Sequence, residues 1–306
     1  MKFLAIVVAL LAEQARPLRR GNPVQAGLAW IAAALEKHFN AGQYRQGMIA
    51  WLCAVGPIVI AILLLQFLLG RTSSLLYFAL SVVVLYVTMG FRRFSHYYNE
   101  ILESLRDGDL PRGRRELSQW INEPADEFTP GEMARVSIER GLIDTHRSVF
   151  GPVCWFILLG PAGALLYRAA VVLHEQWAVR LEPDLADFES FAARALYWID
   201  WLPSRLTALS FAVVGNFEDA IYCWRTQAGS WSVAPRTLLA AAGGGALGLK
   251  LGDTLHQYGR LQYRPELGMG EEVEPDHMHG AIGLVWRSLV LWMFLVFLVT
   301  LAHSLG

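Results

Sequence analysis

Charged residues are scarce in this chain of 306 residues: they make up 17% of it, whereas hydrophobic residues make up 54%. Soluble domains usually carry about 25% charged residues, so the composition excludes an ordinary soluble enzyme. The excess of hydrophobic residues also excludes intrinsic disorder. The formal net charge of −1 provides no basic field, which excludes nucleic acid as a partner.

Cysteines and catalytic signatures are also few. Cys53, Cys154 and Cys223 form no CxxC pair, and we interpret them as small buried side chains. The chain has neither a Gly-x-Ser-x-Gly elbow nor a His-Glu-x-x-His motif, so nothing in it indicates a hydrolase. His277 and His279 form a His-x-His pair, which supplies too few ligands for a zinc site. We therefore predict no metal site.

The chain is instead rich in long apolar runs. A helix that spans a bilayer needs about 20 mostly apolar residues. Residues 51–69, 75–91 and 284–302 fit this requirement, and the first two predict a helical hairpin across the bilayer. Residues 149–167, which contain Pro and Gly, and residues 199–214, which contain two charges, are further candidates. The sequence therefore predicts an all-α polytopic membrane protein with four or five transmembrane helices and a cytoplasmic helical connection.

The distribution of Lys and Arg predicts the orientation, because basic residues concentrate in short cytoplasmic loops. The tip of the hairpin carries only Arg71, whereas its two flanks carry Arg16, Arg19, Arg20, Lys37, Arg45, Arg92 and Arg93. Both flanks are therefore expected in the cytoplasm, and the chain is expected to pass several times through the bacterial inner membrane, with the lipid bilayer as its partner. Trp51 and Trp292 are expected at the membrane interfaces.

These patterns divide the chain into six predicted segments. They are an N-terminal apolar helix with a cytoplasmic segment (1–50), a transmembrane hairpin (51–91), a cytoplasmic helical region (92–148), a membrane-embedded central region (149–214), a polar connection (215–283) and a C-terminal transmembrane helix (284–306). Residues 3–12 are interpreted as a short retained helix rather than a cleaved signal peptide, because charged residues follow them.

The cytoplasmic region has clear helix signals. Apolar residues recur at helical spacing over residues 94–105, which predicts an amphipathic helix, and residues 107–109 end it and start another. Thr129, Pro130 and Glu132 predict a third helix that begins with a capping box.

The polar connection shows no alternation of apolar and polar residues, so no strand is predicted, and residues 264–280 are interpreted as a loop. The glycines of residues 243–250 lack the Lys-Ser/Thr ending of a phosphate-binding loop. We interpret them as small residues that allow close helix packing.

Ionisable residues near the predicted membrane boundaries form the candidate site, because charges at that depth are costly and often functional. The candidate catalytic residues are Glu139, Asp144, Asp200 and Arg205, and the candidate ligand-binding residues are His146, Tyr167 and Arg168. The hypothesis places all seven in one pocket near the cytoplasmic interface. Simpler interpretations are side chains that reach the lipid headgroups and, for Asp200, a helix start.

Residues 105–118, 155–168, 200–207 and 245–252 occur in an order that resembles one known family. They resemble the CobD/CbiB family of cobalamin-biosynthesis membrane proteins and its relative AmpE, an inner-membrane protein linked to β-lactamase induction. The resemblance covers most of the chain, with gaps. It implies adenosylcobinamide-phosphate synthase chemistry, in which an aminopropanol unit is joined to adenosylcobyric acid with ATP and magnesium.

Several motif residues of the synthases are replaced in this chain. Glu139 is retained, but the Glu-Asn and Asp-Gly steps expected within residues 138–148 are absent, and further motif residues differ at 121–124, 169–179 and 233–236. ATP-dependent amide formation needs acids that hold magnesium, and these replacements remove acids. The chain is therefore interpreted as a non-catalytic or altered AmpE-like member that acts in membrane signalling or interaction, with a protein partner and no cofactor.

Two alternatives stay open. The first is a divergent synthase, which would take ATP, magnesium and a corrinoid ligand. The second is a transporter, although the chain lacks paired broken spans in two related halves.

Overall fold

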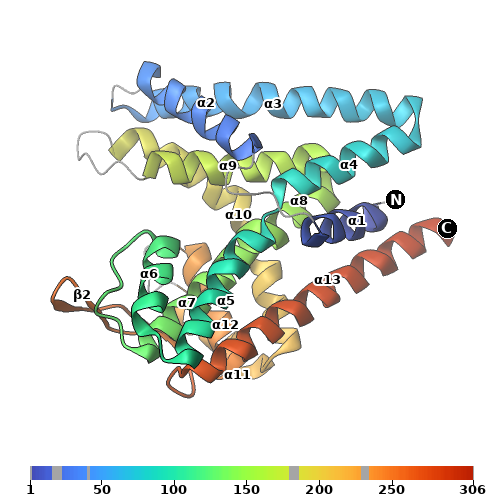
Figure 1. The fold of residues 1–306 in the computed structure, drawn as a ribbon. Helices are drawn as coiled ribbons and strands as arrows, with labels where there is room; N and C mark the ends of the chain where they lie inside the picture. The colour runs from blue at the N-terminus through green and yellow to red at the C-terminus, as the bar shows by residue number, and fades with distance from the viewer. Residues whose placement is uncertain (1, 16–22, 40–41, 179–185, 229–233, 306) are drawn as a thin grey trace. The chain divides into compact units, whose positions relative to one another are not determined.

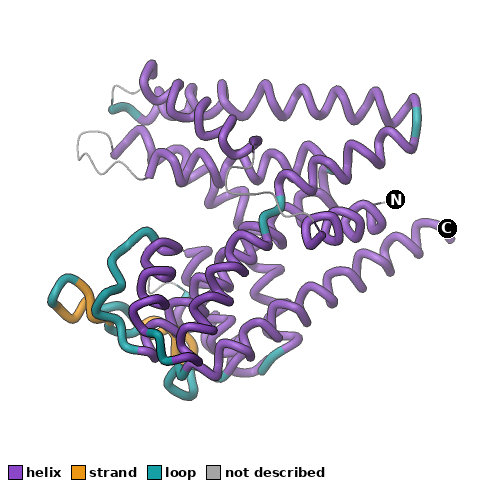
Figure 2. The backbone as a smooth tube through the Cα atoms, in the orientation of Figure 1, coloured by secondary structure: helices purple, strands orange, loops and turns teal. Residues whose placement is uncertain are grey.

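The computed structural model describes residues 2–15, 23–39, 42–178, 186–228 and 234–305. The chain divides into two compact units, of which unit 1 comprises residues 1–90, 147–203 and 300–306 and unit 2 comprises residues 91–146 and 204–299. Helices account for most of the described residues, and strands occur only within residues 250–268 (Figure 2). The all-α prediction is therefore confirmed as the fold class.

Unit 1 is built from helices α1 (Lys2–Ala15), α2 (Pro23–Phe39), α3 (Tyr44–Thr72), α4 (Ser74–Thr88), α8 (Gly151–Leu159) and α9 (Pro161–Ala178), with the first part of α10 (Ala186–Val214). The predicted helical hairpin is present, because extended Ser73 links α3 directly to α4 and the two helices contact each other (Figure 1). The N-terminal apolar helix is present as α1. Arg16, Arg19 and Arg20 lie outside the described residues, and the orientation stays a prediction.

The candidate span at residues 149–167 is not one continuous helix, and its place in the membrane stays a prediction. A π-helical turn (His146–Phe150) leads into α8, which ends at Gly160, and α9 begins at Pro161. Gly160 has a φ of 71°, which is a left-handed conformation that glycine adopts readily, and Pro161 cannot donate a backbone hydrogen bond. The other candidate, residues 199–214, lies within the longer helix α10, which continues through Pro203.

Two helices in the described part of the chain are long and apolar enough to cross a membrane: Tyr44–Thr72 and Pro275–Ala302. Only 22% and 33% of their most apolar windows are buried in the protein, so most of this apolar surface faces outward. Helix α4 is apolar but shorter. Four or five transmembrane helices stay a prediction.

Three side chains differ from their predicted environments. Cys53 is exposed, whereas Cys154 and Cys223 are buried as expected. Trp51 and Trp292 are both buried, so their prediction as interface anchors is wrong. Trp51 packs edge-on against Phe191 in unit 1, and Trp292 donates a hydrogen bond from Nε1 to Ser210 Oγ in unit 2, because each indole faces a neighbouring helix.

Unit 2 contains α5 (Phe91–Asp107), α6 (Leu110–Ile121), α7 (Pro130–Thr145), α11 (Phe217–Gln227), α12 (Ala234–Leu247), a 3-10 turn (Pro275–His277) and most of α13 (Met278–Leu305). The predicted helix boundary at residues 107–109 is confirmed: Gly108 has a φ of 73°, and Asp109 caps α6 by accepting from the Arg112 amide. The capping box is also confirmed. Thr129 Oγ1 accepts from the Glu132 amide, and the Glu132 carboxylate accepts from the Thr129 amide.

The described residues of unit 2 also include four short strands, so the prediction of no strands is wrong. Strand β1 (Lys250–Gly252) pairs antiparallel with β4 (Glu266–Gly268), and β2 (Leu255–Gln257) pairs antiparallel with β3 (Arg260–Gln262). Each has only three residues, which is too short for a periodic pattern. The predicted loop at residues 264–280 accordingly contains β4, the 3-10 turn and the start of α13.

The glycines of α12 pack as predicted. A Cβ atom at Gly243 would lie 2.5 Å from Leu142 Cδ1 of α7, and one at Gly245 would lie 2.6 Å from the Asp219 carbonyl oxygen of α11. Glycine therefore allows α7, α11 and α12 to approach closely, and this packing positions the polar face of α7 described next.

Candidate functional site

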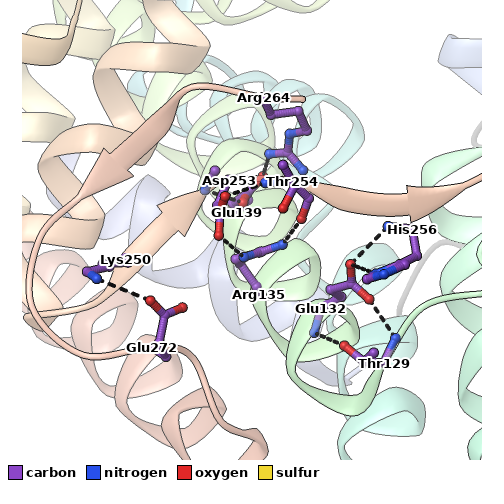
Figure 3. Close-up of polar contacts among 11 residues, drawn as sticks. Thr129, Glu132, Arg135, Glu139, Lys250, Asp253, Thr254, His256, Arg264 and Glu272 are labelled. Atoms are coloured by element: carbon purple, nitrogen blue, oxygen red, sulfur yellow. Dashed lines mark hydrogen bonds and ion pairs between the residues drawn. The ribbon is translucent and has the colours of Figure 1, made fainter. Parts of the chain in front are cut away.

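Helix α7 carries three buried ionisable side chains along one face, because Glu132, Arg135 and Glu139 recur at helical spacing. Burial of such groups is costly unless each has a partner. Their partners come from the segment around β1 and β2, so α7 and this segment are joined by a row of polar contacts (Figure 3).

Glu139 is held by two donors from this segment. Its Oε1 accepts a hydrogen bond from the Gly252 amide at 2.8 Å, and its Oε2 forms an ion pair with the Arg264 guanidinium. The side chains of Glu139 and Arg264 are only 9% and 12% exposed, so this is a largely desolvated pair. Gly252 has a φ of 80° and contacts the Pro265 carbonyl so closely that a Cβ atom would lie 2.1 Å from it.

Arg135 holds the turn between β1 and β2. Its guanidinium pairs with Asp253 Oδ2 at 3.3 Å and donates to the Thr254 carbonyl. Asp253 has a left-handed φ of 59°, and its other carboxylate oxygen accepts from the Thr254 amide at 2.6 Å. The buried arginine therefore fixes the backbone of this turn.

Glu132 joins the start of α7 to β2. Besides its capping role, its Oε1 accepts from the amide and Nδ1 of His256, each at 2.9 Å. Burial acts to raise the pKa of Glu132, but the hydrogen bonds from Thr129 and His256 outweigh it, so the pKa lies below its ordinary value.

A cavity of about 500 Å³ lies beside the Glu139–Arg264 pair within unit 2. Residues of α7, the first turn of α12, the β2–β3 hairpin and residues 263–265 line it. Its charged lining consists of Arg140, Arg236, Arg264, Glu123 and Glu139. The volume is in the range of small-molecule sites, and the arginines suit a ligand that carries negative charge.

Four of the predicted site residues lie in unit 2. Of these, only Glu139 lines the cavity. Asp144 accepts hydrogen bonds from Trp120 Nε1 and Arg140 Nε, and buried His146 contacts Thr207 Oγ1 through Nδ1 at 2.9 Å. Arg205, the fourth, is half-buried on α10.

The other three predicted residues, Tyr167, Arg168 and Asp200, are buried in unit 1. The Tyr167 hydroxyl donates to Asp200 Oδ1. Asp200 lies well inside α10, so its interpretation as a helix start is wrong. The single pocket of seven residues draws on both units and stays a prediction.

Within the described ranges, no three His, Cys, Asp or Glu side chains gather closely enough to hold a metal ion. His277, from the His-x-His pair, lies 3.7 Å from Glu271 and accepts from the Glu274 amide at the start of the 3-10 turn. His277 therefore has a local structural role.

Sequence reasoning missed Arg135, Asp253, Arg236 and Arg264. The spacing of Glu132, Arg135 and Glu139 along one helix was a usable signal for Arg135. No local pattern connects Arg264 to Glu139, because 125 residues separate the two in the chain.

The comparisons with known proteins agree with the order of motifs along the chain. A family model described as CobD/Cbib protein matches residues 3–285. The chain belongs to the CobD/CbiB family. No solved structure matches it.

Curated relatives of this CobD/CbiB-family chain carry the name cobalamin biosynthesis protein CobD. The relative from Stutzerimonas stutzeri is 33% identical over 96% of each chain, and the relative from Chromobacterium violaceum is 34% identical over 78% of this chain and 77% of its own. A relative from Leptospira interrogans is 27% identical over 81% of this chain and 80% of its own. These names favour the synthase alternative, and they do not support the AmpE-like interpretation.

Proposed function

We propose that this chain is an adenosylcobinamide-phosphate synthase, which forms an amide between an aminopropanol unit and adenosylcobyric acid at the expense of ATP. The observation that carries the proposal is the arginine-lined cavity beside the buried Glu139–Arg264 pair. The names of the relatives support the same pathway.

The chemistry needs negative charge to be stabilised in two steps. In the first, a carboxylate oxygen of the corrinoid attacks the γ-phosphorus of ATP, and ADP leaves to give an acyl phosphate. In the second, the amine attacks the acyl carbon, inorganic phosphate leaves, and the amine loses a proton. Phosphate oxygens carry most of the charge in both steps, and arginine binds them through paired hydrogen bonds.

The residues of the cavity fit this requirement. Arg236 would offset phosphate charge, and Glu139 is a positioning residue that holds Arg264 in place. Magnesium commonly binds one or two carboxylates together with substrate phosphates rather than a complete protein cage. Glu123 lines the cavity and would hold magnesium together with the phosphates, and the ion would neutralise phosphate charge there.

We also propose that the chain passes several times through the bacterial inner membrane. Helices α3 and α13 are long and apolar enough to span it, α4 completes a hairpin with α3, and their apolar surface is largely exposed. The lipid bilayer would therefore be the partner of this surface, and a corrinoid would be the large substrate.

The test is complementation of a strain that lacks a cobinamide-phosphate synthase, with membrane insertion confirmed by fractionation. The chain should restore growth on the corrinoid precursor, and the Glu139→Gln and Arg264→Gln variants should each lower the purified activity by about a hundredfold, because small misplacements have effects of that size. The double variant should lose little more than either single variant. Absence of growth with well-inserted protein would refute the synthase function.

The matched control is Glu272→Gln. Glu272 also forms an ion pair in unit 2, with Lys250, but its side chain is 66% exposed and lies outside the cavity lining. Its loss should leave activity unchanged, because exposed ion pairs contribute little.

A further inference from the structure

An exposed tyrosine stands at the opening of the arginine-lined cavity. Tyr263 follows β3 directly, lines the cavity, and is nevertheless 81% exposed. An aromatic ring that is left in solvent beside a cavity offers a flat surface on which a planar ring can stack.

The segment that carries Tyr263 is held firmly to the rest of unit 2. Arg264, the next residue, is fixed by the buried Glu139 carboxylate. At the tip of the β2–β3 hairpin, the Gly259 amide donates to both carboxylate oxygens of Glu127 at 3.0 Å. The backbone that carries the tyrosine is therefore held in place before any ligand binds, which lowers the entropic cost of stacking.

Positive charge gathers in the same cavity. Its lining holds three arginines and two carboxylates; Arg264 is paired with Glu139, and Arg140 is paired with Asp144 outside the lining. Arg236 and Thr237 lie in the first turn of α12, whose N-terminus adds the positive end of a helix dipole. An anionic group of a ligand is therefore favoured beside Arg236 and the start of α12.

The size of the cavity limits the ligand. About 500 Å³ suits a molecule with a few phosphate groups and one ring system, and sites for small molecules span roughly 300–1,000 Å³. A whole corrinoid is much larger than such a ligand, so the cavity suits the smaller, phosphate-bearing substrate of the reaction.

We propose that this cavity binds a nucleoside triphosphate, with Arg236 on the phosphate chain and Tyr263 stacked on the base. The inference rests on the proposed function, which supplies the triphosphate as a substrate. It deepens that function by assigning this substrate to named residues. A phosphate ester without a base would use the same arginines but would not need Tyr263.

The test measures binding of ATP and of inorganic tripolyphosphate to the purified full chain in detergent. Arg236→Gln should weaken both ligands by about tenfold or more, because it removes charge-assisted hydrogen bonds. Tyr263→Ala should weaken ATP by about tenfold and leave tripolyphosphate unchanged, because only ATP has a base to stack. Tyr263→Phe should retain the affinity for ATP.

The matched controls are Arg225→Gln and Tyr222→Ala. Both residues lie exposed on α11 in the same unit and outside the cavity lining, so neither change should alter binding. Thermal unfolding without ligand checks that each variant folds. If Arg236→Gln does not fold, Tyr263→Ala still tests the inference, because an exposed tyrosine can be replaced without disturbing the fold.

Two results would overturn the inference. In the first, ATP binds Arg236→Gln and Tyr263→Ala as tightly as it binds the unaltered chain, which places the nucleotide elsewhere. In the second, Tyr263→Ala leaves the affinity for ATP unchanged while Arg236→Gln weakens both ligands, which identifies a phosphate site without a base contact.

Complementation separates this inference from the proposed function. Growth with Arg236→Gln at full activity rejects this site but keeps the synthase function. Nucleotide binding by the unaltered chain without growth keeps the site but rejects the synthase function.

Discussion

The hydroxyl of Tyr167 donates a hydrogen bond to Oδ1 of Asp200 over 2.9 Å, and both side chains are buried in unit 1. The tyrosine ring fits there because residue 151 is glycine: a Cβ atom at that position would lie 2.2 Å from the ring. The pair therefore joins α8, α9 and α10 through one packed ring and one hydrogen bond, which is a structural role for two residues that the sequence marked as site candidates.

Tyr167→Phe should destabilise the protein without changing the activity of folded molecules. The change removes a hydrogen bond to a buried carboxylate, which costs about 1–3 kcal/mol. The measurement is the thermal unfolding midpoint in detergent, together with the synthase rate per folded molecule. A lost rate at an unchanged midpoint would contradict the structural role and return Tyr167 to the candidate ligand-binding residues.

Acidification should weaken the start of α7 through Glu132. The folded-state pKa of Glu132 lies below its ordinary value of 4.5, so the ionised carboxylate stabilises the fold. This stabilisation is fully present above about pH 4.5 and is lost as pH falls through the lower folded-state pKa. The free energy of unfolding, measured from pH 7 downward, should therefore fall less steeply in Glu132→Gln. Parallel curves for the two proteins would show that Glu132 does not carry this effect.

Close packing of α12 should make Gly245→Ala destabilising. The added methyl group would meet the Asp219 carbonyl at 2.6 Å, and overpacking of this kind costs about 1–3 kcal/mol. Gly283→Ala in α13 is the matched control, because nothing lies within 4 Å of its Cβ position and alanine favours a helix. The measurements are the folded yield and the unfolding midpoint of the two variants. Equal values for both variants would contradict the packing argument.

Cys53 offers a test of the membrane location. It is exposed on α3, within the predicted span at residues 51–69, so in a bilayer its thiol should face lipid. In intact membranes we expect labelling by an apolar maleimide but not by a charged, water-soluble one. Buried Cys223 is the internal control, since burial and the nearby Asp219 raise its pKa to about 11 and keep it unreactive near neutral pH. Rapid labelling of Cys53 by the charged reagent would place that part of α3 in water.

Local chemistry explains why parts of the fold were predictable. The capping box at Thr129, the helix boundary at Gly108 and the apolar hairpin of α3 and α4 all depend on residues close together in the chain. The packing role of the glycines at 243–250 also follows from their local composition. The broken helix at Gly160 was missed because a continuous apolar composition resembles one span even where a Gly-Pro step interrupts it.

The sequence by itself determined the all-α class, the helix boundaries at residues 107–109 and 129–132, and the order of motifs that places the chain in the CobD/CbiB family. Only the tertiary structure decided the candidate site, because Glu139 and Arg264 are far apart in the chain and meet only when the strand segment folds against α7. A buried carboxylate needs a partner, but composition and periodicity do not say which of the many arginines supplies it. The partner depends on long-range packing, and that packing also brings Arg236 and Tyr263 to the same cavity.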